Sequence, residues 1–148
     1  MNIVNDVALP ILFVLLFVLL WAKNVYCLKL ALQFHRDVKA NMYIQCWAEI
    51  TLAFGTTTGR YFSRNSRKYA RATYTVDRNQ ICANMICAYD SKIDKGDKVT
   101  IIIPESNPKI FAFSKQHLKN AVLTYSVLTV VFAFLSIGMT VIYLLAFF

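Results

Sequence analysis

Acidic residues gather at one place in the chain where metal chemistry could be expected, at Asp90, Asp94 and Asp97. Clustered carboxylates are ligands that calcium prefers, yet the spacing of these three fits no calcium-binding loop. Lysines alternate with them, at Lys92, Lys95 and Lys98. Alternating charges of this kind are typical of a solvated turn, so we predict no metal site there.

The other nucleophiles and bases are scattered along the chain. Cys82 and Cys87 have no histidine near them, so their spacing does not predict a zinc site. We expect His35 and His117, which lie close to two apolar segments, to be surface residues at a membrane interface. Glu49 is expected to form a surface ion pair. The sequence contains no Gly-rich phosphate loop, zinc-hydrolase helix or nucleophile elbow, so we predict a non-enzymatic protein without catalytic residues, metal ligands or cofactors.

One basic segment could bind a ligand, because aromatic residues Tyr61, Phe62 and Tyr69 are interspersed among its cations. The candidate binding residues are Arg60, Arg64, Arg67, Lys68, Arg71 and Arg78. The favoured ligand is the anionic headgroup of a phospholipid, followed by an acidic protein partner. A plain solvated face is the third alternative. Stacking of single-stranded nucleic acid is the weakest, and we predict no nucleic-acid partner.

Two apolar segments determine how this chain is organised. The run from Ala121 to Phe148 has no charged residue and no histidine, and at about 1.5 Å per residue it would extend roughly 42 Å as a helix, enough to cross a bilayer. A second run, Val7 to Ala22, is interrupted only by Pro10. It would extend only about 24 Å, so we expect its helix to continue past Lys23 as a juxtamembrane stalk.

The distribution of charge predicts the topology. All 16 Lys and Arg residues lie between Lys23 and Lys119, and the only acidic residue outside this segment is Asp6. By the positive-inside rule, the middle of the chain is cytoplasmic and both termini are outside, in a multi-pass protein of the cell (inner or plasma) membrane. The cysteines would then be in a reducing compartment, where we expect small buried thiols rather than disulfides.

The fold class predicted is membrane α+β, with two transmembrane helices flanking a small β-domain. The first helix and its stalk cover residues 1–40, the cytoplasmic β-domain covers 41–114, and the second transmembrane helix covers 115–148. Residues 42–54 alternate without interruption, which predicts a strand whose even-numbered residues, including Leu52 and Phe54, face the core.

Further strands are predicted in the middle segment. Residues 69–76 and 80–89 form the arms of a hairpin, and residues 98–103 and 109–113 complete about five short strands. Residues 56–68 are predicted to be a loop because they are polar, basic and contain glycine. The strands are expected to form a small antiparallel sheet or partly closed barrel.

The final helix carries small or hydroxylated residues at spacings of three and four, at Ser126, Thr129, Ala133, Ser136 and Thr140. In lipid such a stripe favours close helix packing, against the first span or against another protein. The alternative is that the hydroxyls bond to carbonyls of their own helix and the stripe has no packing role.

Residues 72–80 (ATYTVDRNQ) and 95–108 (KGDKVTIIIPESNP) carry a further pattern. It resembles the bacterial family known as domain of unknown function 3592, in which a Tyr-x-Tyr-x-Val strand and a short polar turn precede Gly-x-x-Val-x-Val-x-Tyr-x-Pro-x-Asn-Pro. The matching positions are Tyr74, Val76, Gly96, Val99, Ile101, Pro104, Asn107 and Pro108, whereas Ile81 and Ile103 depart from it. The resemblance covers residues 42–113 and implies the same arrangement of spans and β-domain, but no activity.

These observations predict a non-enzymatic protein that binds another membrane or secretion-associated protein, as an accessory or immunity-type subunit. The predicted contacts are the final helix and the basic cytoplasmic face, and the partner is a membrane protein or a second copy of the chain. The alternative is a subunit of an oligomeric small channel or transporter. Two spans cannot enclose a pathway alone, and no charge inside them marks an ion route.

Overall fold

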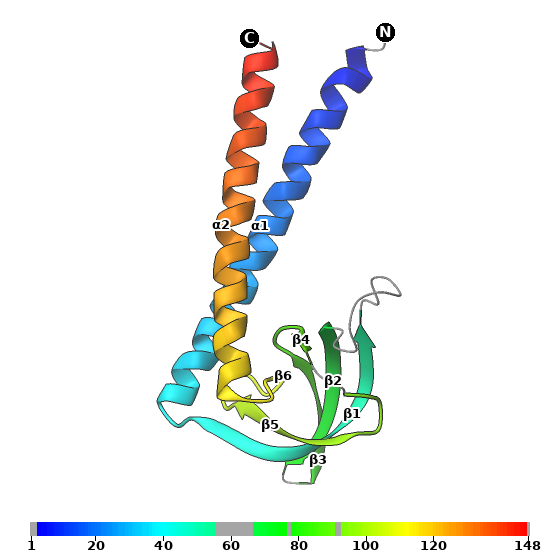
Figure 1. Ribbon diagram of the computed structural model, residues 1–148, viewed down its shortest axis with the longest axis vertical. Coiled ribbons are helices and arrows are strands. Elements are labelled where there is room, and N and C mark those ends of the chain that lie inside the picture. Colours follow the sequence, from blue (N-terminus) through cyan, green and yellow to red (C-terminus); the bar gives the residue numbers. More distant parts are fainter. Residues whose placement is uncertain (1–2, 56–66, 77, 91–92, 148) are drawn as a thin grey trace. The chain divides into compact units, whose positions relative to one another are not determined.

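The computed structural model describes residues 3–55, 67–76, 78–90 and 93–147. Its elements follow the order α1 (Ile3–Lys39), β1 (Tyr43–Gly55), β2 (Arg67–Val76), β3 (Asn79–Met85), β4 (Tyr89–Asp90), β5 (Lys98–Pro104), β6 (Ile110–Phe111) and α2 (Lys115–Phe147) (Figure 1). The contacts divide the chain into a helical unit, residues 1–30 and 123–148, and a β-domain, residues 31–122. The β-domain includes the C-terminal end of α1 and the N-terminal end of α2.

Both helices are long and apolar enough to cross a membrane, over Pro10–Lys39 and Lys115–Leu145. They differ from the core helices of soluble proteins in burial: 6% of the most apolar window of the first is buried, and 0% of that of the second. α1 continues without a break past Lys23 to Lys39, so the predicted stalk is part of the same helix. Pro10 lies inside α1, seven residues after its start at Ile3, so the helix lacks the hydrogen bond that an N–H at this position would donate to the Asp6 carbonyl.

α1 ends in a backbone cap, and the buried carboxylate of Asp37 holds this end of the helix in the β-domain. Asn41 adopts a left-handed conformation with φ 58°, and Met42 N–H donates to the Asp37 carbonyl over 2.8 Å. This is the hydrogen-bond pattern of a Schellman cap, in which asparagine is tolerated in place of glycine. The Asp37 side chain is buried, and it accepts a hydrogen bond from Ser106 Oγ in the corner after β5. Helix end and corner are thereby joined inside the β-domain.

The sheet is mixed rather than wholly antiparallel. Its strand order is β5-β1-β2-β3-β6, with the short β4 also paired with β2. β1 with β2, β1 with β5, and β2 with β3 are antiparallel as predicted. The prediction was wrong for β6, which pairs with β3 in parallel. The corner after Pro104 brings β6 alongside β3 in the same direction, because the chain crosses from β5 at one end of the strand order to β6 at the other.

The sheet curls far enough for its two outer strands to meet. Ile102 of β5 and Ala112, which follows β6, exchange two backbone hydrogen bonds of 2.8 and 3.0 Å. This single bridge gives the partly closed barrel predicted from the sequence. Inside it lie the core residues Ala48, Ile50, Ala70, Ala72, Tyr74, Ala83, Met85, Ile93, Ile101, Ile103 and Phe111.

β1 departs from its predicted alternation at one residue. Its register with β2 shifts between Ile50 and Leu52, so Thr51 forms a β-bulge. An extra residue reverses the faces of every side chain beyond it. The placement of Leu52 and Phe54 in the core was therefore wrong: they are 45% and 57% exposed, and Ala53 packs against the core instead.

The predicted loop at residues 56–68 lies mostly outside the described residues, and its last two residues, Arg67 and Lys68, belong to β2. The turns that are described use residues with positive φ. Arg78, between β2 and β3, has φ 66°, and Gly96, before β5, has φ 94°. Glycine suits the second of these turns because it has no Cβ to disfavour a left-handed conformation.

Candidate functional site

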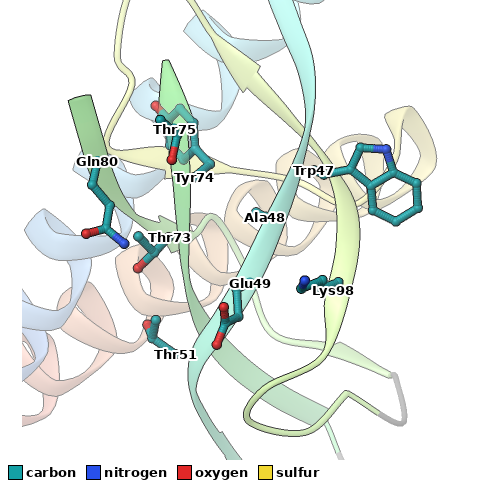
Figure 2. Close-up of a pocket in the computed structure, with 9 residues that line it drawn as sticks. All are labelled: Trp47, Ala48, Glu49, Thr51, Thr73, Tyr74, Thr75, Gln80 and Lys98. Carbon is teal, nitrogen blue, oxygen red and sulfur yellow. The ribbon is translucent and has the colours of Figure 1, made fainter. Parts of the chain in front are cut away.

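β1 changes its neighbour halfway along its length, and the residue at which it does so is Glu49. Tyr43 to Glu49 pairs with β5, whereas Glu49 to Gly55 pairs with β2. Glu49 is the only described residue of β1 that has a register partner on both sides, Lys98 on β5 and Thr73 on β2. Before Glu49, β1 and β2 separate (Figure 2).

The separation leaves backbone groups of β1 facing a gap. Ile50 N–H donates to the Asp97 carbonyl and Met42 accepts from Glu105, so the even-numbered residues of β1 bond towards β5. In an antiparallel ladder, alternate residues point their backbone groups to opposite sides. The N–H and C=O groups of Tyr43, Gln45 and Trp47 therefore point away from β5, at an edge that pairs with no strand among the described residues.

β2 contributes to the same gap from the other side. Thr73 pairs with Glu49, so the odd-numbered residues of β2 point their backbone groups towards β1. The next odd residue, Thr75, has no register partner on β1. Trp47 and Thr75 would have been opposite each other had the two strands stayed together, and both present backbone donors and acceptors to the space between them.

A groove of about 420 Å³ occupies this region. Its lining residues are Trp47, Ala48, Glu49, Thr51, Thr73, Tyr74, Thr75, Gln80 and Lys98. They come from β1, β2, β3 and β5. Figure 2 shows Glu49 between Lys98 on one side and Thr73 and Gln80 on the other. Most of these side chains are polar because they lie on the outer face of the sheet, whereas Ala48 and Tyr74 are buried residues of the core.

Many hydrogen-bonding groups of the groove are not used within the described chain. Thr51 Oγ1 donates to the Arg71 carbonyl over 3.2 Å, and Thr73 Oγ1 lies 3.5 Å from Cys82 Sγ. The side chains of Glu49, Thr75, Gln80 and Lys98 form no hydrogen bond or ion pair with another described residue, so the expected ion pair of Glu49 is not seen there. The opposite charges of Glu49 and Lys98, the Thr75 hydroxyl and the Gln80 amide can therefore bind polar groups of a partner.

Trp47 is the most exposed aromatic residue of the groove. Its side chain is 73% exposed. An indole combines a large apolar face with one N–H donor, and tryptophan is enriched at the centres of protein interfaces for that reason. The groove thus combines an aromatic anchor, polar side chains and free backbone groups, which is what a bound polypeptide segment requires.

No family model matches the chain, and neither a curated protein nor a solved structure matches it. The resemblance of residues 42–113 to the family known as domain of unknown function 3592 therefore stays a prediction.

Of the six predicted basic residues, the structure describes the side chains of Arg71 and Arg78 alone. Arg60 and Arg64 lie outside the described residues, and the side chains of Arg67 and Lys68 are not described. Arg71 is exposed and its Nε donates to Asn84 Oδ1 over 3.0 Å. Arg78 is at the far end of the β2–β3 hairpin, about 23 Å from Arg71 at roughly 3.3 Å per residue, so the two cannot contact one headgroup.

The predicted stripe lies on α2, where Ser126, Thr129, Ala133 and Ser136 are half-buried and Thr140 is exposed. In the helical unit, Phe132 lies 6.4 Å from Phe17 of α1 between ring centroids. Thr140 lines an apolar hollow of about 280 Å³ with α1 residues Ile11, Val14, Leu15 and Val18. Of the stripe residues, Thr140 is therefore the one that the structure places beside α1.

The hydroxyls of the stripe also bond to their own helix, as the alternative reading proposed. Ser136 donates to the Phe132 carbonyl over 2.7 Å, and Thr140 donates to the Ser136 carbonyl over 2.8 Å. Thr129 differs, because its buried hydroxyl oxygen has no hydrogen-bond partner among the described residues. Bonding within the helix is therefore present at Ser136 and Thr140, and the packing role of the stripe stays a prediction.

The prediction that His117 is a surface residue was wrong, since it is 1% exposed. Its Nδ1 accepts from Phe113 N–H over 3.3 Å, so Nε2 carries the proton and donates to the Cys87 carbonyl over 2.9 Å. The ring joins the start of α2 to the segment after β3. The position of His117 next to an apolar run predicted a membrane interface. Nothing in the sequence indicates its long-range contact with Cys87.

The thiols are only partly as predicted. Cys87 is buried, Cys46 and Cys27 are half-buried, and Cys82 is exposed on β3. Burial raises the pKa of the Cys46 thiol. No group of three or more His, Cys, Asp or Glu residues that could hold a metal ion occurs in the part of the chain that the structure describes.

Gln45, Trp47, Thr75 and Lys98 were not predicted from the sequence to be binding residues. The alternation in β1 could have indicated some of them, because it places Gln45, Trp47 and Glu49 together on the polar face of the strand. The gap between β1 and β2 has no sequence signal, because it depends on where along β1 the pairing with β2 stops, at Glu49 and Thr73.

Proposed function

We propose that this protein is a non-enzymatic membrane protein that binds an extended segment of another membrane protein at the groove between β1 and β2. The observation that carries the proposal is the open edge of β1, where the backbone groups of Tyr43, Gln45 and Trp47 pair with no other described strand and lie beside polar side chains. An exposed strand edge is a template for pairing with a further strand. Accessory or immunity-type binding is the class of function that fits.

The edge lacks the features that usually prevent such pairing. Natural edge strands are protected by lysine, proline or a bulge, and Tyr43 to Trp47 (YIQCW) contains none of these. A segment bound there would bond to the backbone of β1, and its alternate side chains would meet Trp47 and the opposite charges of Glu49 and Lys98. Backbone bonds supply affinity, and the side-chain contacts supply selectivity.

The proposed location is the cell membrane, with the β-domain on the cytoplasmic side and both termini outside. Two helices of sufficient length and apolarity support the membrane location. The confinement of all Lys and Arg residues to the segment between the apolar runs supports the orientation. The partner in this proposal is a protein of the same membrane, because its binding segment would then be held near the β-domain.

Proline substitutions in the full chain can test the edge itself. Gln45→Pro removes an N–H that points to the gap and leaves the bonds to β5 in place, so the fold should be kept. Cys46→Pro is the matched control, because its N–H points to β5, and its loss should lower the thermal unfolding midpoint.

A photo-crosslinking amino acid at Thr75, with a control at the exposed Lys109, would report binding in the producing cells. We expect a discrete adduct from position 75 only, and we expect Gln45→Pro to abolish it. An adduct of twice the chain's mass would identify a second copy as the partner. An adduct that survives Gln45→Pro in a folded protein would contradict strand pairing at this edge.

A further inference from the structure

The bulge at Thr51 creates an apolar surface at the end of the β1–β2 pair that the alternation of the sequence would have buried. Leu52, Phe54 and Tyr69 are 45%, 57% and 44% exposed. Phe54 and Tyr69 are register partners, and their rings stack with centroids 6.0 Å apart. We call these three residues together with Arg71 the bulge patch.

A cation adjoins the apolar side chains of the bulge patch. Arg71 is the register partner of Leu52, and it lies on the same face of β2 as Tyr69, two residues away. It is exposed, and its Nε donates to Asn84 Oδ1, which leaves the other guanidinium nitrogens able to donate outward. An apolar surface with an arginine beside it is the combination that suits the boundary between headgroups and acyl chains.

The basic residues in the surrounding sequence indicate that the bulge patch would bind a negatively charged surface. Between Ile50 and Val76 the chain contains Arg60, Arg64, Arg67, Lys68 and Arg71 and no acidic residue. Basic residues near a membrane are attracted to anionic lipids, and aromatic residues are enriched at headgroup depth. An acidic protein surface would satisfy the cations, but it would not explain an apolar and aromatic surface of this kind at the same position.

We propose that the bulge patch docks into the headgroup layer of an anionic bilayer, with Leu52, Phe54 and Tyr69 at the boundary of the acyl chains and Arg71 at a lipid phosphate. The inference uses the proposed membrane location but not the binding groove, so either can fail without the other. This docking depends on the β-bulge, because in a regular strand Leu52 and Phe54 would face the core and the surface would lose its apolar part.

Spin labelling of the full chain in lipid vesicles tests the docking. A nitroxide is attached at Phe54→Cys, or at Thr75→Cys as the control on the same face, after the native cysteines are changed to alanine. In phosphatidylcholine vesicles containing phosphatidylglycerol, we expect the label at 54 to collide more with oxygen and less with a water-soluble nickel chelate than in phosphatidylcholine alone. High salt should reverse this change, and the label at 75 should show none.

Equal collision rates at position 54 in the two lipids would overturn the proposal. So would protection from both reagents, since that outcome means that a protein covers the patch. Hydrogen exchange of the chain with its native cysteines is the second measurement. Slower exchange in β2 is expected only with anionic vesicles, and it should be lost with Tyr69→Ser and with Arg71→Gln. Failure of the photo-crosslinking experiment at Thr75 would leave these results unaffected.

Discussion

Glu49 and Thr73 form the last register pair of β1 and β2 before these strands separate, and the candidate groove begins at this pair. β5 begins at Lys98, opposite the same glutamate. The junction therefore brings a carboxylate, an ammonium group and a hydroxyl to the end of an unpaired edge. Four predictions follow from the contacts around this junction and from the way in which the β-domain is held together.

Thr51 should stabilise the bulge through its hydroxyl. We expect Thr51→Val to lower the free energy of unfolding by about 1 kcal/mol, because the Arg71 carbonyl loses a donor at a point where the ladder is already interrupted. Thr75→Val is the matched control, since that hydroxyl makes no hydrogen bond within the described residues, and it should change stability little. Chemical denaturation of both variants in detergent measures the difference. Equal stabilities would show that the Thr51 hydrogen bond does not contribute.

Tyr74 should make the β-domain sensitive to alkaline pH. Its hydroxyl donates to the Pro108 carbonyl over 2.8 Å, and burial, followed by the Cys46 charge, raises the pKa of the phenol above its ordinary value of 10.0. A raised pKa means that the contribution of the neutral phenol is complete below pH 10 and is lost as pH rises through the higher value.

Tyr74→Phe should cost about 1 kcal/mol at neutral pH, and it should reduce the loss of stability between neutral and strongly alkaline pH. Unfolding curves across that range measure both effects. An unchanged alkaline loss in Tyr74→Phe would assign the sensitivity to other groups.

His117 should hold the start of α2 to the segment after β3. We expect His117→Ala to cost about 2 to 4 kcal/mol, because the substitution removes a buried ring and leaves Phe113 N–H and the Cys87 carbonyl without these partners. Lys119→Ala, an exposed change two residues along the helix, is the control and should be close to neutral. Thermal unfolding of the two variants checks this. A small effect of His117→Ala would mean that water replaces both hydrogen bonds.

The orientation of the β-domain can be read from Cys82, which is exposed on β3. Cys46 should react slowly in the folded protein, because burial raises the pKa of its thiol and lowers the thiolate fraction. With a membrane-impermeant maleimide, we expect no labelling of Cys82 in intact cells and rapid labelling in inverted vesicles. Cys82→Ser should remove the signal. Labelling in intact cells would place the domain outside and contradict the proposed topology.

The sequence by itself determined the two apolar helices, the β-rich segment between them and most of the core face of the strands. Helix length and apolar runs are local properties, and Ala70, Ala72 and Tyr74 face the core because side chains alternate along any strand. Cys46, Ala48 and Ile50 follow the same rule, whereas Met42 and Ile44, also predicted to face the core, are 48% and 37% exposed. The concentration of basic residues between the helices is also a property of composition alone.

Only the tertiary structure decided the bulge at Thr51, the parallel pairing of β6 with β3, the burial of His117 and the gap between β1 and β2. Each depends on a partner far along the chain: Arg71 for Thr51, β3 for β6, Cys87 for His117, and Thr73, where β2 stops pairing with β1, for the gap. An uninterrupted alternation predicted Leu52 and Phe54 in the core, because one extra residue in a strand is visible only against the register of its neighbour. The surfaces proposed to bind a partner and a bilayer both arise from these long-range pairings.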